Sequence, residues 1–393
     1  MKRLSLCTFR CLIICLILIV GTTGCWNRRE LNSLAIAMGV GIDKLGGEDV
    51  KNKLRLTVQI VKTSEIKISE KGGTSAEAYW NATETGESMF EVIRGFTHQS
   101  SRKIYWPHNK VIIFGRSLAE AGIREHIDFF IRDQETRLGV WILVADDQAS
   151  DIFDIKPGLE RIPAIGLANV LNAQKASSET TAIKLYDFAA RLMSKTTAPI
   201  AAFVKISGQG SEKSLFVTGT AVFKQDKLVG ELNKTETRGL LWVIDKVKSG
   251  IIDVESPVSK GKVSLEIIRA KSKITPEIIE DKVHIKVDIT EDGNIGSQSC
   301  VDDLETPKII EELERIKNAA IESEVRAALS KAQKLNADIF GFGDVVHQKF
   351  PKEWKELESR WDEIFPDLEV EVTVEGKIRR SGSSNKAVAP AKE

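Results

Sequence analysis

The sequence predicts a multi-domain protein of mixed α/β (α+β) class, with mixed sheets flanked by helices, that follows a cleaved lipoprotein signal peptide. Three observations support this fold class. Strand-like apolar alternation and helix-like periodicity follow each other from residue 34 to about residue 198. The chain has 393 residues, enough for two or three domains. Its apolar fraction of 42% is ordinary for a globular protein, so packed cores can supply its stability.

Residues 1–24 have the layout of an export signal. Basic residues come first (Lys2, Arg3 and Arg10), an apolar segment spans residues 12–20, and residues 21–24 are small. The apolar segment is shorter than the roughly 20 residues that cross a hydrocarbon core. An uncleaved N-terminal membrane helix is therefore the weaker alternative.

Cys25 directly follows the small residues, and this ending resembles a bacterial lipoprotein box. It departs from that pattern at Thr22, where lipoproteins usually carry Leu. The resemblance implies that Cys25 becomes the first mature residue and carries a diacylglyceryl group and an N-acyl group, palmitate being the typical acid. Two or more acyl chains hold a protein stably on a membrane. Trp26, Arg28 and Arg29 could add interfacial contacts, or Trp26 could dock on its own domain.

Charge and cysteine content exclude some classes of function. The chain has 56 Lys+Arg and 56 Asp+Glu, and removing residues 1–24 removes three bases, which leaves 53 against 56 and a net charge of about −3. This balance does not suit nucleic-acid binding, which needs a clustered basic face. Cys7, Cys11 and Cys15 leave with the signal and Cys25 is lipidated, so Cys300 has no partner for a disulfide.

The N-terminal domain is expected to span residues 25–198. Asn27 and Glu30 have capping-box spacing, and a strand with large residues on one face and small ones on the other is expected at 34–42. A second strand with one wet face is expected at 54–60, followed by a mobile polar loop at 63–87. The remaining elements alternate between helices at 89–96, 118–132, 160–174 and 182–194 and strands at 103–106, 110–114 and 138–145.

Residues 199–255 form either a small middle domain or the edge of the neighbouring domain. A hairpin is expected at 215–223 and 227–232, a helix at 236–246 and a strand at 249–252. The C-terminal α+β domain, residues 256–380, is expected to hold strands at 262–267, 283–289 and 368–378 and helices at 306–335 and 352–365. Asp292-Gly293 predicts a hairpin turn, and residues 381–393 predict a disordered tail.

Candidate catalytic and metal-binding residues are each better explained as structure. The histidines have no metal-ligand spacing: His98, His108, His126, His284 and His347. Asp288, Glu291 and Asp292 crowd the expected turn without calcium-loop spacing. No nucleophile elbow stands at 207–211. The sequence therefore predicts no catalytic residue, no cofactor and no metal.

Two further runs have a structural interpretation beside a functional one. Gly341-Phe342-Gly343-Asp344 suggests a phosphate loop, but it lacks the G-x-x-x-x-G-K-[ST] pattern and is better explained as a helix terminator and turn. Residues 132–137, RDQETR, are either a partner-facing patch or a solvated helix end with local ion pairs, the second being favoured.

Six segments together resemble one known family. They are CWNRRELNSLAIAMGVGID at 25–43, HNKVIIFG at 108–115, DFFIRDQETR at 128–137, GTAVFKQDKLVGEL at 219–232, DIFGFGDVVHQKFPKEWKELESRW at 338–361 and VEVTVEGKIRRSG at 370–382. In this order they are similar to the Ger(x)C family, the lipoprotein C subunits of spore nutrient-germinant receptors such as GerAC, GerBC and GerKC. The resemblance covers nearly the whole mature chain.

The resemblance implies a non-enzymatic protein on the outer face of the spore inner membrane, assembled there with an A-type and a B-type membrane subunit so that nutrients trigger germination. The only functional residue it transfers is the lipid-bearing cysteine, Cys25. One alternative is a solute-binding lipoprotein that captures the nutrient itself, although two similar lobes with a hinge are not visible. An envelope hydrolase is the weakest alternative, because no nucleophile–base pair emerges.

Overall fold

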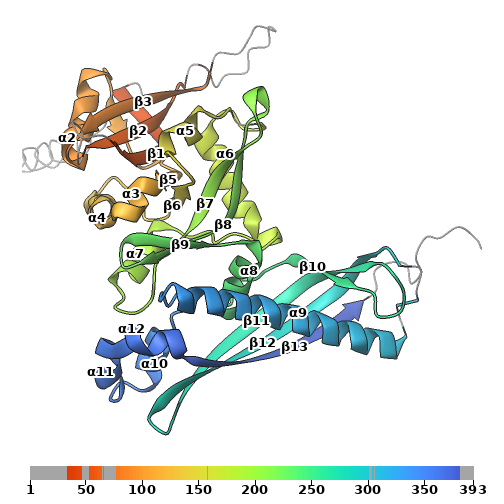
Figure 1. The fold of residues 1–393 in the computed structure, drawn as a ribbon. Helices are drawn as coiled ribbons and strands as arrows, with labels where there is room; N and C mark the ends of the chain where they lie inside the picture. The colour runs from red at the N-terminus through yellow and green to blue at the C-terminus, as the bar shows by residue number, and fades with distance from the viewer. Residues whose placement is uncertain are drawn as a thin grey trace, which may run out of the picture.

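The computed structural model describes residues 33–46, 53–63, 65, 77–156, 158–300, 303–304 and 306–380. They form two β-sheets with helices packed against them (Figure 1). The predicted mixed α+β class is confirmed. The predicted signal peptide (1–24), Cys25 with its neighbours Trp26, Arg28 and Arg29, and the predicted tail (381–393) lie outside the described residues.

The first sheet has nine strands in the order β3-β2-β1-β5-β6-β7-β8-β9, with β4 beside β1. Four central strands, β1, β5, β6 and β7, are parallel, whereas the strands beyond them at both edges are antiparallel. The strands are β1 (Leu34–Lys44), β2 (Leu54–Val61), β3 (Tyr79–Gly86), β4 (Lys103–Tyr105), β5 (Val111–Phe114), β6 (Trp141–Ala145), β7 (Ile200–Ser207), β8 (Ser214–Lys224) and β9 (Lys227–Leu232).

Helices cover both faces of this sheet. One face packs on α5 (Ala149–Asp154) and α6 (Pro163–Ala173). The other packs on α2 (Met89–Gly95), α3 (Arg116–Ala121), α4 (Arg124–Arg132) and α7 (Leu185–Met193). The helix predicted at 118–132 is thus two helices, because Gly122 adopts a φ of 125° between them. Burial on both sides gives the central strands almost entirely apolar sequences.

The strand predicted at 34–42 is confirmed, but its faces are only partly as predicted. A bulge between Ala37 and Gly39 shifts the register against β2, so Met38 shares a core with α5 and α6 while Val40 and Ile42 face the opposite core. On the α5–α6 side, a Cβ at Gly39 would lie 2.5 Å from the Phe153 ring. The small residues therefore permit a close helix–sheet approach, as expected.

Two predictions for residues 54–87 are wrong. The second strand has no wet face, because Thr57 and Gln59 are buried beneath α5 and α6. The Gln59 side chain compensates by accepting a hydrogen bond from Ala164 N at 2.9 Å and donating one to Asn81 Oδ1 at 3.0 Å. The predicted loop contains strand β3, and its residues 66–76 lie outside the described part.

The second sheet has four strands in the order β10-β11-β12-β13. They are β10 (Gly250–Glu255), β11 (Lys262–Ile279), β12 (Lys282–Gln298) and β13 (Glu369–Arg380). The long helix α9 (Pro307–Lys334) packs across one face of this sheet, and α10 (Phe342–Lys349), α11 (Trp354–Leu357) and α12 (Trp361–Ile364) lie at one end (Figure 1). The long helix and the closing strand are as predicted, whereas the helix predicted at 352–365 is interrupted.

The predicted turn at Asp292-Gly293 is wrong, because both residues lie inside β12. The β11–β12 turn is at Glu280-Asp281, which have φ values of 50° and 60°. Positive φ at both positions is what a two-residue hairpin needs. Gly293 instead makes room for a buried carboxylate, since a Cβ there would lie 2.6 Å from Glu291 Oε1. The predicted crowding of Asp288, Glu291 and Asp292 at a turn is therefore also wrong.

Residues 199–255 contribute to both sheets. They supply β7, β8 and β9 to the first sheet and β10 to the second. Between them α8 (Lys234–Val243) packs tightly on α9, and one apolar core continues from the first sheet through α8 into the second. The independent middle domain and the domain boundaries at 198 and 255 stay predictions.

Candidate functional site

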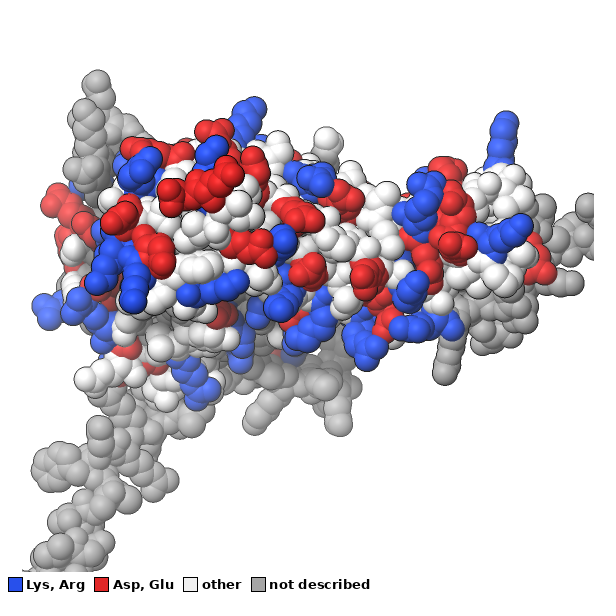
Figure 2. All heavy atoms as spheres, turned by 90° about the horizontal axis from the view of Figure 1, so that it is seen from below, with Lys and Arg blue, Asp and Glu red and all other residues white. Residues whose placement is uncertain are grey.

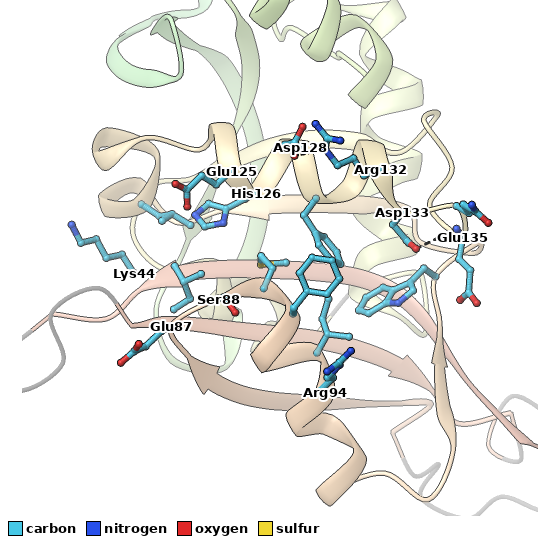
Figure 3. Close-up of a pocket in the computed structure, with 18 of the residues that line it drawn as sticks. Lys44, Glu87, Ser88, Arg94, Glu125, His126, Asp128, Arg132, Asp133 and Glu135 are labelled. Carbon is cyan, nitrogen blue, oxygen red and sulfur yellow. Dashed lines mark hydrogen bonds and ion pairs between the residues drawn. The ribbon is translucent and has the colours of Figure 1, made fainter.

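A groove of about 960 Å³ lies on the first sheet, between α2 and the α3–α4 pair. Figure 3 shows α4 carrying His126 and Arg132 on one side of the groove and Ser88 and Arg94 of the α2 segment on the other. Both α2 and α4 pack on the sheet, and the groove lies between them.

The groove has an apolar floor and one unusually exposed aromatic residue. Phe90 on α2 is 68% exposed and packs edge to face on Phe129 of α4, with ring centroids 5.2 Å apart. Met89, Ile93 and Leu118 continue the apolar lining. An exposed Phe beside a concave apolar surface is typical of a site that receives a ligand or a partner.

His126 lines the groove from α4. It is 7% exposed, and its Nδ1 has no hydrogen-bond partner among the described residues. Burial lowers the pKa of His126, although Glu125 opposes this effect. The imidazole is therefore a neutral polar group at the groove wall, and its Nδ1 is shielded from solvent. No local sequence pattern marks His126, and only the tertiary structure separates it from the other histidines.

Charged side chains line the rim of the groove. Two ion pairs are formed there, Arg132 Nε to Asp128 Oδ2 and Lys103 Nζ to Glu135 Oε1, both at 2.6 Å. Arg132, Asp133, Gln134 and Glu135 of the predicted 132–137 run line the groove. The run thus takes part in one local ion pair, Arg132 with Asp128, as the favoured interpretation expects, and in one with the distant Lys103. Whether it also faces a partner stays a prediction.

The usual ligand position of an open α/β sheet is filled by the protein itself. That position is the crevice at the carboxyl ends of the parallel strands. Here Asp43, which is 2% exposed at the end of β1, accepts hydrogen bonds from Ala149 N at 2.6 Å and Ser150 N at 3.0 Å at the start of α5. Burial raises the pKa of the Asp43 carboxyl, while these two bonds lower it. The side chain occupies the place that a phosphate takes in nucleotide-binding folds.

The other predicted candidates do not come together. Within the described residues no group of three or more His, Cys, Asp and Glu side chains could hold a metal ion. Cys300 is a buried free thiol in the apolar core that continues from the first sheet into the second. His284 pairs with Glu369 at 3.2 Å, and His347 stacks on Trp354. The face in Figure 2 mixes Lys and Arg with Asp and Glu, as a solvated surface does.

Gly341-Phe342-Gly343-Asp344 starts a helix rather than ending one, so the predicted terminator is wrong. Gly341, with φ 78°, precedes α10. The backbone N–H groups of Gly341, Phe342 and Gly343 donate to the buried carboxylate of Asp338 at 2.9, 3.1 and 2.9 Å. The loop does bind an anion, but the anion is a side chain of the same protein.

By its fold the chain is a two-sheet, mixed α+β protein with a large surface groove on its first sheet. Two family models match it: residues 27–206 match "Spore germination protein N-terminal domain" and residues 218–382 match "Spore germination B3/GerAC like, C-terminal". The chain belongs to this family of GerAC-like spore germination proteins, which confirms the Ger(x)C resemblance.

Curated relatives agree with this assignment, and a solved structure shares the fold. Spore germination protein KC of Bacillus subtilis (strain 168) is 26% identical over 96% of this chain and 98% of its own length. Spore germination protein YndF of the same organism is 27% identical over 94% and 96%. The crystal structure of the GerBC protein has a similar fold, with a TM-score of 0.54 at 21% identity, covering 90% of this chain and 99% of that one.

In the described part of the chain, no helix is both long enough and apolar enough to cross a membrane.

Proposed function

We propose that this protein is a lipid-anchored, non-enzymatic subunit of a spore germinant receptor. The observation that carries the proposal is the match of both family models, which together extend from residue 27 to residue 382. The proposed partners are an A-type and a B-type membrane subunit, and the proposed place is the outer face of the spore inner membrane. Cys25, with diacylglyceryl and N-acyl groups, is the proposed anchor. An anchor raises the effective concentration of the domain for membrane partners.

Replacing Cys25 by alanine is expected to move the protein from the membrane fraction to the soluble fraction of disrupted spores. Removing the acyl chains removes most of the membrane affinity, which a single chain would hold only marginally. The nutrient response, measured as dipicolinate release, is expected to fall with it, while release by a non-nutrient trigger stays unchanged. Cys300→Ala is the matched control, because that thiol is buried in the core. A full nutrient response with the C25A protein in the soluble fraction would disprove the anchor's role.

The groove supports a second candidate function, direct capture of the nutrient. Its apolar floor and its charged rim suit a small molecule with an apolar part and a polar group. If this function holds, calorimetric titration of residues 26–393 with amino acids and sugars should detect binding, and Phe90→Asp should weaken it at least tenfold. Phe216→Asp is a matched control on the same sheet, outside the groove lining, with a Phe that is 46% exposed. If no nutrient gave a binding heat, direct nutrient capture would be ruled out and only the non-enzymatic subunit role would remain.

A further inference from the structure

A second, smaller pocket of about 360 Å³ lies at the amino end of the parallel strands. Residues from the loop before β5, the start of β6, helix α6 and the residue before α7 line it. Three of its lining residues are cations, Lys110, Arg137 and Lys184, and none is an acid. None of these three cations forms an ion pair with a described carboxylate, whereas Lys103 and Arg132 at the groove do.

The cations surround an amphipathic surface with several hydrogen-bonding groups. Lys184 Nζ lies 4.8 Å from the centroid of the Trp141 ring. Asn169 and Asn172 of α6 add two amides to the lining. Uncompensated cations with amide donors around an open hollow suit an anion that can accept several hydrogen bonds, and a phosphate group does so.

A buried polar group in the same pocket independently indicates a missing partner. Asn109 is 8% exposed, and its Oδ1 has no hydrogen-bond partner among the described residues. As placed, Oδ1 is an acceptor and would repel an anion. A flip of the amide exchanges its oxygen and nitrogen, and the flipped group, with its NH₂ at this position, is the orientation that an anion would select. Buried polar atoms without a partner are rare and call for an explanation.

The pocket lies at the end of the first sheet at which β1, the first strand of the chain, begins. Val111 of β5 and Trp141 of β6 are in register with each other and with Gly39 of β1, and all three strands are parallel. The chain enters β1 at Leu34, only nine residues after Cys25, a distance of at most about 30 Å when extended. An anchor at Cys25 would therefore hold this end of the sheet near the lipid head groups.

We infer that this pocket binds the phosphate of an anionic phospholipid head group and fixes the orientation of the first sheet on the membrane. The inference rests on the proposed anchoring at Cys25 for its choice of a lipid as the source of phosphate. Lys110, Arg137 and Lys184 supply the charge, Asn109 supplies a hydrogen bond, and Trp141 lies at the level of the interface, where amphipathic aromatic rings are favoured.

The test uses the chain of residues 26–393 without its lipid, so that binding does not depend on acylation or on germination. Sedimentation with phosphatidylglycerol vesicles is expected to exceed sedimentation with phosphatidylcholine vesicles. The triple variant Lys110→Glu, Arg137→Glu, Lys184→Glu is expected to reduce the partition coefficient on phosphatidylglycerol at least tenfold, because each base near an anionic surface contributes measurably. Asn109→Ala should reduce it about threefold without changing the net charge.

The control variant carries the same change of net charge in the C-terminal part: Lys308→Glu, Lys352→Glu and Lys355→Glu, all exposed. It is expected to bind phosphatidylglycerol vesicles like the unmodified chain. An equal loss in both triple variants would show general surface attraction and overturn the inference. Saturation by inorganic phosphate or glycerol phosphate without vesicle binding would overturn the lipid source. Retained binding by the folded K110E/R137E/K184E variant, checked by circular dichroism, would also overturn it.

Discussion

Replacing Asp338 by alanine is expected to lower the free energy of unfolding by about 4 kcal/mol near pH 4. The carboxylate is fully buried and accepts three backbone N–H bonds at the start of α10 and a fourth bond from Trp361 Nε1 at 3.2 Å. Alanine leaves these four donors buried without an acceptor, each at a cost of about 1 kcal/mol or more. The backbone bridge between Asp338 and Thr197 remains in the variant. The lost unfolding free energy therefore measures the contribution of the carboxyl group alone.

The effect of Asp338 should depend on pH. Burial raises the pKa of this carboxyl from 3.8 to about 6, against the lowering effect of its hydrogen bonds. The native state therefore holds the proton more tightly than the unfolded state, and the stability this group contributes is complete below about pH 4 and falls as the pH rises through 6. The decline is at most about 3 kcal/mol. The gap between the unmodified protein and Asp338→Ala should narrow by that amount between about pH 4 and pH 7.

Urea unfolding at several pH values measures this gap. Asp362→Ala is the matched control on the same side of the molecule. Asp362 is exposed, and its carboxylate forms a surface ion pair with Lys224 at 3.2 Å. It should leave the pH profile unchanged. An Asp338→Ala protein as stable as the unmodified one at pH 4 would contradict the role of this carboxyl, as would a gap that widens with rising pH.

Replacing Lys317 by methionine is expected to cost about 3–5 kcal/mol of unfolding free energy near pH 7. Lys317 of α9 and Glu291 of β12 form an ion pair at 2.5 Å, with side chains 0% and 1% exposed. Gly293 and Gly376 make the space, because a Cβ at Gly376 would lie 2.8 Å from Lys317 Cε and one at Gly293 would lie 2.6 Å from Glu291 Oε1. Methionine keeps the packing of the side chain but leaves the carboxylate buried without a cation.

Two comparisons separate charge from packing in this variant. Burial raises the pKa of Glu291 even beside Lys317, so the Lys317→Met deficit should shrink as the pH falls and Glu291 becomes neutral. The double variant Lys317→Met, Glu291→Gln should recover most of the stability, because it removes both charges. Lys271→Met, which breaks an exposed pair with Asp245, should change little. A double variant as unstable as Lys317→Met would assign the loss to packing instead.

The spacing of apolar residues predicted most helices and strands, because this spacing is a local property of the sequence. Leu34, Val40 and Ile42 mark β1, the apolar repeat from Ile309 onward marks α9, and the alternation around Val372 marks β13. Periodicity failed where a segment distant in the sequence changed the environment of a residue. The alternation in β2 predicted a solvent-exposed Gln59, but α5 and α6 cover it. Asp292-Gly293 predicted a turn, but Gly293 instead leaves space for the Glu291 carboxylate, which pairs with Lys317.

The candidate site could be predicted less well than the fold. The sequence by itself determined the α+β class, the family resemblance and a proposed anchor at Cys25, because these depend on the order and spacing of residues along one chain. Only the tertiary structure decided that Phe90 and His126 share a groove, that Lys110, Arg137 and Lys184 share a pocket, and that Asp338 fills the Gly341–Gly343 loop. Such groupings arise from contacts between distant segments, and no local pattern specifies which distant side chain will satisfy a buried donor or remain without a partner.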